Sequence, residues 1–248
     1  GISRFWGYGG GYISANFQTY DKTFSPEGRD PLHLKAYTEF IETAKDGKLP
    51  QTLPRPDANL EQDYGVGNLT NNPYRKKILN LLGVKYIVHK DELLQDPSAP
   101  QVNTFPEKEY QLVWYQAPWQ IYENKDVAPR AFLASDYIVV KDRGKIIENF
   151  YQPSFNEETT IILEKQPIEK VSNLTKGAVR ILTYQPNTVK LEAITDASAL
   201  LFLSDTHSPT WIATIDGNPT EVLRADYAFR AVVVPKGKHV VTFFYILK

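Results

Sequence analysis

The chain of 248 residues contains no cysteine and no methionine. Without thiols it holds no disulfide, zinc–thiolate site, iron–sulfur cluster or cysteine nucleophile. Because methionine is missing even at position 1, we expect the chain to be a processed or excised piece of a longer protein. No run approaches the roughly 20 apolar residues that a helix needs to cross a bilayer. What remains is a globular domain without thiol chemistry.

The chain also lacks an excess of charge of either sign. Its 28 basic and 29 acidic residues give a formal net charge of −1. Nucleic acids and anionic membrane surfaces attract proteins through a basic field, so this balance argues against both partners. The hydrophobic fraction of 42% is ordinary, and the length suits one large domain or two small ones.

The first 150 residues predict a mixed α/β region. Its opening combines glycines with many large aromatics, which is typical of an ordered loop. The glycine run 9–11 is a weak phosphate-loop candidate, since no strand is expected before it and no helix follows at the right distance. Asp30 and Pro31 indicate the start of a helix that ends at Gly47.

A second helix is expected from Asn72 and Pro73 to Gly83, with a strand directly after it from Val84. Further along, the pattern predicts a short helix near residues 145–150. Strands are expected over residues 111–115, 119–123, 130–134 and 136–140.

Residues 151–248 predict an antiparallel β-sandwich, so the expected fold class is α+β. Within 188–194 apolar and charged residues alternate, as in a sheet with one solvated face. Asp216-Gly217 is a two-residue hairpin signal. Trp211 is expected in the core, and Arg230 is expected to pair with Asp226 or Asp216. The strands are expected over residues 160–164, 179–184, 188–194, 200–204, 211–215, 220–224, 229–234 and 240–246.

No segment carries a catalytic or metal-binding signature, so we assign no catalytic residue, no metal and no cofactor. Asp21, Asp30 and His33 form a polar set suited to acid–base work, but Asp30 already serves as a helix cap. The acidic loop of Asp57, Glu61 and Asp63 lacks the spacing of a calcium site. The four histidines fit no zinc pattern, and Ser204-Asp205 lacks the glycine frame of a nucleophile elbow.

Aromatic side chains are the better candidates for a binding site, because the C–H faces of sugars pack on tryptophan and tyrosine beside polar groups. Two groups are candidates. The group that we select as a glycan site is Trp6, Tyr8, Tyr12, Asn16, Tyr20 and Asp21, and the second group is Trp114, Tyr115, Trp119 and Tyr122. For both groups the alternative is that the aromatic side chains lie in the core.

The C-terminal residues 201–245 resemble the YfhO-like family of bacterial membrane proteins. The stretches 80–88 and 123–134 resemble the family too, and the opening resembles the lead-in of large bacterial and archaeal membrane proteins. The residues that carry the C-terminal pattern are Ser204-Asp205, Pro209, Trp211, Asp216-Gly217, Ala225, Phe229-Arg230, Pro235, Gly237 and His239.

The resemblance implies a soluble extracytoplasmic domain of a polyprenyl-phosphate-sugar glycosyltransferase-type protein, held at the bacterial or archaeal membrane by helices outside this chain. Catalytic residues in that architecture lie in the membrane part, so none is transferred here. The expected partners are a glycan or cell-envelope polymer and the transmembrane part of the same polypeptide, with no nucleic acid. The alternatives are a structural or protein-interaction module and a secreted carbohydrate-active enzyme; the enzyme would need paired carboxylates in one cleft.

Overall fold

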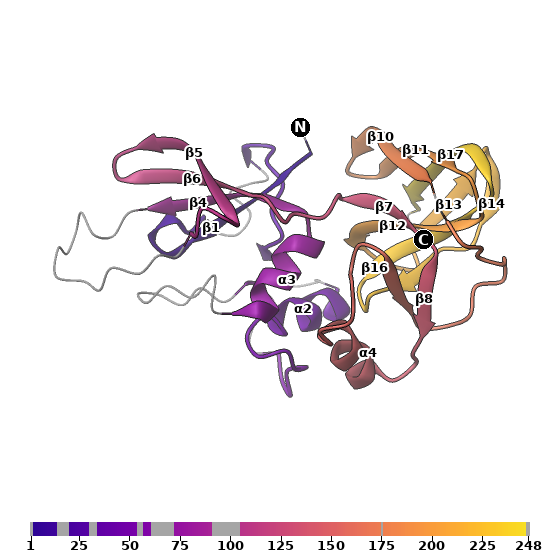
Figure 1. The fold of residues 1–248 in the computed structure, drawn as a ribbon, viewed down its shortest axis with the longest axis horizontal. Helices are drawn as coiled ribbons and strands as arrows, with labels where there is room; N and C mark the ends of the chain where they lie inside the picture. Colours follow the sequence, from indigo (N-terminus) through magenta and orange to yellow (C-terminus); the bar gives the residue numbers. More distant parts are fainter. Residues whose placement is uncertain are drawn as a thin grey trace. The chain divides into compact units, whose positions relative to one another are not determined.

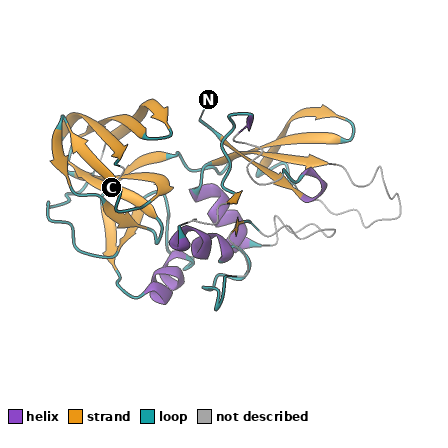
Figure 2. Cartoon of the chain, turned by 180° about the vertical axis from the view of Figure 1, so that it is seen from behind, coloured by secondary structure: helices purple, strands orange, loops and turns teal. Residues whose placement is uncertain are grey.

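The computed structural model describes residues 2–13, 20–29, 34–53, 57–60, 72–90, 105–174 and 176–246. The chain divides into two compact units, Gly1–Ala128 and Pro129–Lys248 (Figure 1). This division comes earlier than the boundary expected at residue 150, because strands within 131–139 pair with strands of the second unit. The described residues are mostly β, as the strands in both units show (Figure 2).

Unit 1, the N-terminal one, contains a four-stranded sheet in the order β1-β4-β6-β5. β1 and β4 are parallel, and the other neighbours are antiparallel. A second sheet of two short antiparallel strands, β2 (Gly28–Arg29) and β3 (Asp57–Ala58), completes its strand content among the described residues. The strands of the larger sheet are β1 (Arg4–Tyr8), β4 (Val84–Lys90), β5 (Tyr110–Gln116) and β6 (Trp119–Asn124).

The glycine run forms a short 3-10 turn, η1 (Gly9–Gly11), directly after β1. The expectation that no strand precedes this run was therefore wrong. A Cβ on Gly11 would lie 2.5 Å from the carbonyl oxygen of Val88, and one on Gly7 would lie 2.3 Å from that of Gly11. These glycines allow backbone segments to approach closely, which explains the composition of the loop without a bound phosphate.

In the part of unit 1 that the structure describes, β2 is followed by the helices α2 (Lys35–Glu42) and α3 (Pro73–Leu81). The expected start of the first helix at residues 30–31 lies outside the described residues. The second prediction is confirmed: Asn72 Oδ1 accepts a hydrogen bond from the Arg75 amide at 3.0 Å, and Gly83 has a φ of 66° before β4 begins. The Asn72 side chain also donates to the Ala44 carbonyl at 3.0 Å, so one residue joins the start of α3 to the segment after α2.

The described residues of unit 2, the C-terminal one, form a five-stranded sheet, a six-stranded sheet and α4 (Arg143–Phe150). The five-stranded sheet runs in the order β10-β11-β17-β13-β14, and the six-stranded sheet in the order β7-β12-β16-β15-β9-β8. The strands are β7 (Ala131–Ala134), β8 (Asp136–Val139), β9 (Thr160–Leu163), β10 (Gly177–Gln185), β11 (Thr188–Thr195), β12 (Ala199–Thr206), β13 (Trp211–Ile215), β14 (Asn218–Thr220), β15 (Leu223–Ala225), β16 (Phe229–Val234) and β17 (Gly237–Tyr245).

The pairing in unit 2 departs from the predicted antiparallel pattern at one place. β8 and β9 are parallel, because the chain passes through α4 between them and returns in the same direction. The predicted strand over 220–224 is divided into β14 and β15, which belong to different sheets. The Asp216-Gly217 turn is confirmed, with φ values of 51° and 86°.

The core of unit 2 draws side chains from both of its sheets. Val189, Leu191 and Ala193 are buried on one side of β11, whereas Lys190 is exposed on the other, as the alternation predicts. The complete buried cluster is Ala131, Val189, Leu191, Ala193, Leu201, Leu203, Ala213, Val232, Val234, Val241 and Phe243.

Candidate functional site

The N-terminal aromatic set is divided by the structure into a buried and an exposed part. Trp6 is fully buried and Tyr8 is 3% exposed. Their rings lie 5.6 Å apart, and Tyr8 meets Phe105 edge-on at 5.9 Å. Both side chains therefore belong to the core of unit 1.

Glu27 is the polar partner of this aromatic core. Its Oε1 accepts hydrogen bonds from the Trp6 indole at 3.0 Å and from the Leu60 amide at 2.9 Å. Burial of the carboxyl raises its pKa from 4.5 to about 7, and the two donors offset only part of that rise. Sequence reasoning missed Glu27, since nothing in its neighbourhood marks it as buried.

The exposed part of the set comprises Tyr12, Tyr20 and Asp21. Tyr12 is 39% and Tyr20 85% exposed, and Asp21 beside Tyr20 is also exposed. Asn16 lies outside the described residues, as do Asp30 and His33. Glu61 and Asp63 lie outside them too, and the part of the chain that the structure describes holds no group of three possible metal ligands.

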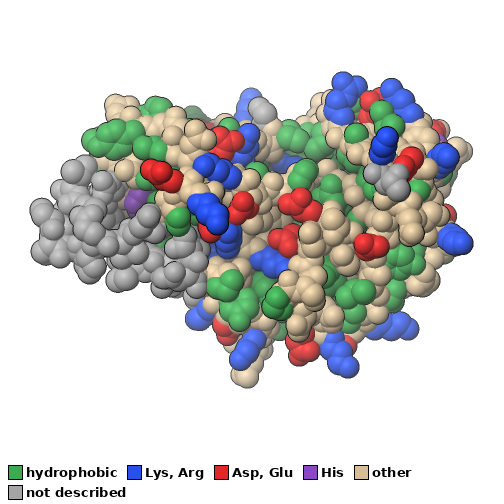
Figure 3. Space-filling view, in the orientation of Figure 1, with side chains coloured by type: hydrophobic (Ala, Val, Ile, Leu, Met, Phe, Trp, Pro, Cys, Tyr) green, Lys and Arg blue, Asp and Glu red, His purple; other side chains and the backbone are tan. Residues whose placement is uncertain are grey.

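The second aromatic group lies on the hairpin of β5 and β6. We call its exposed side chains, Leu112, Val113, Trp114, Tyr115 and Trp119, the aromatic hairpin. Tyr122 does not belong to it, because its ring stacks on Phe105 at 3.9 Å. Figure 3 shows hydrophobic side chains gathered over this end of unit 1.

Unit 2 holds a buried ionic cluster that begins at Arg130, just before β7. The Arg130 side chain contacts Asp205 Oδ1 through Nε at 3.2 Å and through Nη2 at 3.0 Å. Tyr184 accepts from Arg130 and donates to Asp205 Oδ2 at 2.8 Å, and the Arg130 guanidinium lies 4.0 Å from the Tyr184 ring centroid. Tyr184 comes from the five-stranded sheet and Asp205 from the six-stranded one, so the cluster joins the two sheets.

Arg230 is the second cation of this cluster. Its Nη2 lies 3.3 Å from Asp205 Oδ2, so the expectation of Asp226 or Asp216 as its partner was wrong. Its guanidinium stacks over Trp211 at 3.9 Å and near Phe243 at 5.3 Å. Burial lowers the pKa of Arg230, and its Nε and Nη1 have no hydrogen-bond partner among the described residues. Ring faces replace hydrogen-bond acceptors around this cation.

Two histidines of unit 2 lie in opposite environments. His239 Nδ1 lies 2.7 Å from Asp216 Oδ2, and this hydrogen bond raises the pKa of His239. His207 Nδ1 lies 3.4 Å from Nε of Arg224. Burial is the main cause that lowers the pKa of His207 to about 4, and the positive charges of Arg224, Arg230 and Lys165 act in the same direction.

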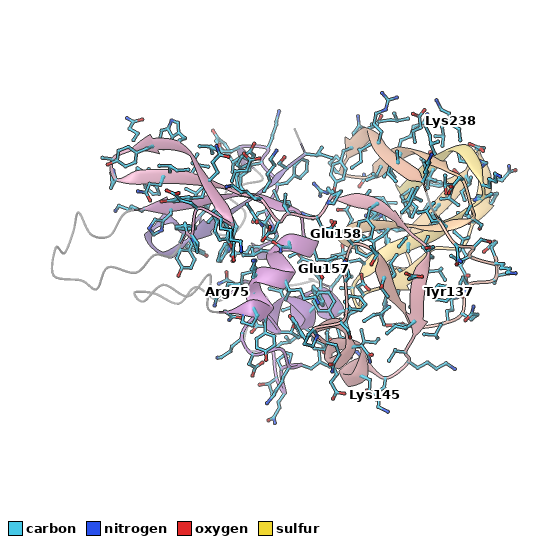
Figure 4. The ribbon with its side chains drawn as sticks, viewed as in Figure 1. Arg75, Tyr137, Lys145, Glu157, Glu158 and Lys238 are labelled. Atoms are coloured by element: carbon cyan, nitrogen blue, oxygen red, sulfur yellow. The ribbon has the colours of Figure 1, made fainter. Side chains whose placement is uncertain are left out.

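On the exposed side of β17, Lys238 (labelled in Figure 4) forms an ion pair with Glu192 at 2.9 Å.

The residues that carry the resemblance are thus brought together as pairs: Asp205 with Arg230, Arg230 with Trp211, and Asp216 with His239. Each pair fixes one strand or turn to another within unit 2. Unit 2 is therefore a β-rich module in which the residues that carry the resemblance connect its strands and turns to one another.

Residues 149–248 match the family model described as "Bacterial membrane protein YfhO", which confirms the resemblance over this part of the chain. The searches of curated proteins and of solved structures give no match. The matched family is described as one of bacterial membrane proteins, and the match covers the last 100 residues of the chain. Among the described residues, no helix has the length and apolar character needed to span a membrane.

Proposed function

We propose that this chain is a non-catalytic, extracytoplasmic module of a YfhO-like membrane protein that recognises or positions a cell-surface glycan or polymer. The polymer would be presented to a membrane-embedded part of the same polypeptide. The observation that carries this proposal is the family match over 149–248. In a glycosyltransferase-type architecture the chemistry belongs to the membrane part, which leaves acceptor binding to the module.

The exposed side chains of the N-terminal set supply the contact in this proposal. Tyr20 presents most of its ring to solvent beside the Asp21 carboxylate, and Tyr12 presents a second ring. A ring face and a neighbouring carboxylate are the combination that packs on a sugar and accepts from its hydroxyls. Trp6 and Tyr8 would contribute only through the core of unit 1, in which they are buried.

Unit 2 would serve as a rigid support, with its two sheets packed face to face as a β-sandwich. The shared core and the Arg130–Asp205–Tyr184 cluster support this packing, since both draw residues from each sheet. The same ionic cluster favours the second candidate function, a structural module without a ligand, because its charges are engaged within the fold.

Thermal unfolding with soluble peptidoglycan fragments and with teichoic acid tests the proposal. A ligand that binds only the folded state at 100 times its Kd stabilises it by about 2.7 kcal/mol. We expect Tyr20→Ala to remove the stabilisation and Tyr115→Ala, an exposed tyrosine of the aromatic hairpin, to retain it. Absence of any shift with the unmodified chain would favour the structural module.

A further inference from the structure

The aromatic hairpin departs from the burial pattern of a strand on a core. In such a strand every second side chain is covered. In β5 only Tyr110 is buried, and the six residues after it are exposed. Leu112, Val113, Trp114 and Tyr115 are consecutive, so both faces of the strand are open, with exposed fractions between 43% and 54%.

This exposure follows from the position of the hairpin in the sheet. Among the described strands, β5 lies at the edge of the sheet and pairs with β6. The base of the hairpin is fixed, because Tyr110 is buried edge-on against Phe105 at 5.6 Å and Asn124 donates to Asn80 at 2.8 Å. Beyond this base the two strands run side by side to the turn that joins Gln116 to Trp119 (Figure 1).

The chemistry of the hairpin is apolar and uncharged. No residue from Tyr110 to Tyr122 carries a charge. Trp114, Tyr115 and Trp119 combine a large apolar ring with one polar atom, the composition that gathers where the lipid headgroups of a bilayer meet its hydrocarbon. Lys90 lies at the rim, with its ammonium 5.9 Å from the Trp119 ring centroid. Exposed apolar patches of this kind mark membrane or protein contact sites.

The neighbouring groups favour a bilayer over a sugar as the occupant. A sugar site needs free polar atoms beside the rings. The exposed amides of β5, Gln111 and Gln116, stand at its two ends, whereas Leu112 and Val113 beside the rings have no polar side-chain atom. Gln120 Oε1 already accepts from the Tyr122 hydroxyl at 3.0 Å. The transfer of aliphatic side chains from water into lipid has a favourable free energy. Because residues 149–248 match a family of membrane proteins, we expect the chain to lie close to a bilayer.

We propose that the aromatic hairpin inserts its exposed side chains into the interfacial zone of a lipid bilayer and so docks unit 1 on the membrane surface. The docking is apolar, in keeping with the chain's net charge of −1. It therefore operates on zwitterionic lipid and resists salt. It is independent of the glycan binding proposed above, which would engage Tyr12, Tyr20 and Asp21.

The test is cosedimentation of the complete chain with phosphatidylcholine vesicles, together with tryptophan fluorescence. We expect binding, a blue shift, and quenching of the emission by lipids brominated on their acyl chains. Trp114→Gln and Trp119→Gln should each lower the partition coefficient by about tenfold, since each removes a large apolar contact. The controls are Tyr20→Ala and Ile168→Ser, at exposed positions outside β5 and β6, which should partition normally.

Circular dichroism and thermal unfolding establish that each variant is folded. Loss of partitioning in a folded Trp114→Gln or Trp119→Gln variant supports the proposal. Three results would overturn it: no binding to phosphatidylcholine, equal partitioning of hairpin and control variants, or binding that needs phosphatidylglycerol and disappears in 0.5 M salt. A blue shift that appears without vesicles would also overturn the proposal. If soluble glycan produces it, the hairpin is a glycan site, and if high protein concentration produces it, the hairpin binds a second copy of the chain.

Discussion

The two units bury a carboxyl group in opposite ways. In unit 2, Asp205 lies between two guanidinium groups, those of Arg130 and Arg230. In unit 1, Glu27 has two neutral donors, the Trp6 indole and the Leu60 amide, and its pKa rises to about 7. Burial of a charge is offset by an opposite charge in one unit and by uptake of a proton in the other.

This difference teaches how each unit responds to its surroundings. The charges of unit 2 are joined across two sheets, so their removal affects the whole unit. The carboxyl of unit 1 responds to pH, and the aromatic hairpin of the same unit is open to solvent. Since the chain has no cysteine, a labelled cysteine placed at Tyr20 or Ile168 reports on the unfolding of one unit at a time.

The largest effect is expected from Asp205→Asn. The change leaves two buried guanidinium groups without their anion, and breaking a buried ion pair in this way costs about 3–5 kcal/mol. Urea unfolding followed at the Ile168 label measures the loss. Asp136→Asn, at an exposed position, is the control and should be nearly neutral. Equal effects of the two variants would show that the cluster contributes little to stability.

Glu27 should give unit 1 a pH dependence. A carboxyl whose pKa is higher in the folded state holds its proton more tightly there, so its contribution is fully present below about pH 4.5 and is lost as the pH rises through 7. Between pH 4.5 and 8 we expect a loss of about 3 kcal/mol. Urea unfolding of Glu27→Gln, followed at the Tyr20 label, should lack this slope; an unchanged slope would assign it to another group.

His207 should give unit 2 the opposite dependence. Its pKa is about 4 in the folded state, below the ordinary value of 6.5, so the unfolded state binds the proton more readily. Stability is retained above pH 6.5 and falls as the pH drops toward 4. His207→Gln should flatten this acid limb in urea unfolding. His239→Gln, whose histidine has a raised pKa, should instead lower stability mainly below the folded-state pKa of that group.

Asn72→Ala should destabilise unit 1 by about 1–2 kcal/mol, because it removes the cap of α3 and the bond to the Ala44 carbonyl. Asn72→Asp separates the two roles, since aspartate still accepts from the Arg75 amide but cannot donate. If Asn72→Asp and Asn72→Ala behave alike in urea unfolding, the link to the segment after α2 is the more important one.

The smallest effect is expected from a pair of glycines that differ in backbone conformation. A Cβ meets nothing within 4 Å at either Gly217 or Gly28. Gly217 has a φ of 86°, so Gly217→Ala should cost about 1 kcal/mol, whereas Gly28→Ala should be neutral or slightly stabilising. Thermal unfolding of both variants checks this, and a loss at Gly28 would contradict it.

Local signals account for the parts of the fold that could be predicted. Asn72-Pro73 and Gly83 mark the ends of α3 by chemistry that acts within one helical turn. Asp216-Gly217 sets a turn because both residues accept a positive φ. The parallel β8–β9 pair and the division of 220–224 between two sheets depend on how distant segments meet, which local patterns do not encode.

The sites show the same limit. Arg230 and Asp205 lie on neighbouring strands, β16 and β12, where the register shifts after Leu203. Sequence proximity suggested Asp226 or Asp216 instead, because pairing across a sheet depends on that register. Aromatic composition identified Trp6 and Tyr20 alike, yet one is core and the other is exposed. Which ring is covered is decided by the elements packed upon it.

The parallel pairing of β1 with β4 has a consequence for synthesis of the protein. Arg4 bridges to Phe24 early in the chain, but it is registered in the sheet with Val84, so β1 gains its strand partner β4 only after about 80 further residues have been added. At roughly 5–20 residues per second the ribosome needs about 4–16 seconds for this. During that time the segment Arg4–Tyr8, with Phe5, Trp6 and Tyr8, lacks its pairing with β4 and is available to chaperones.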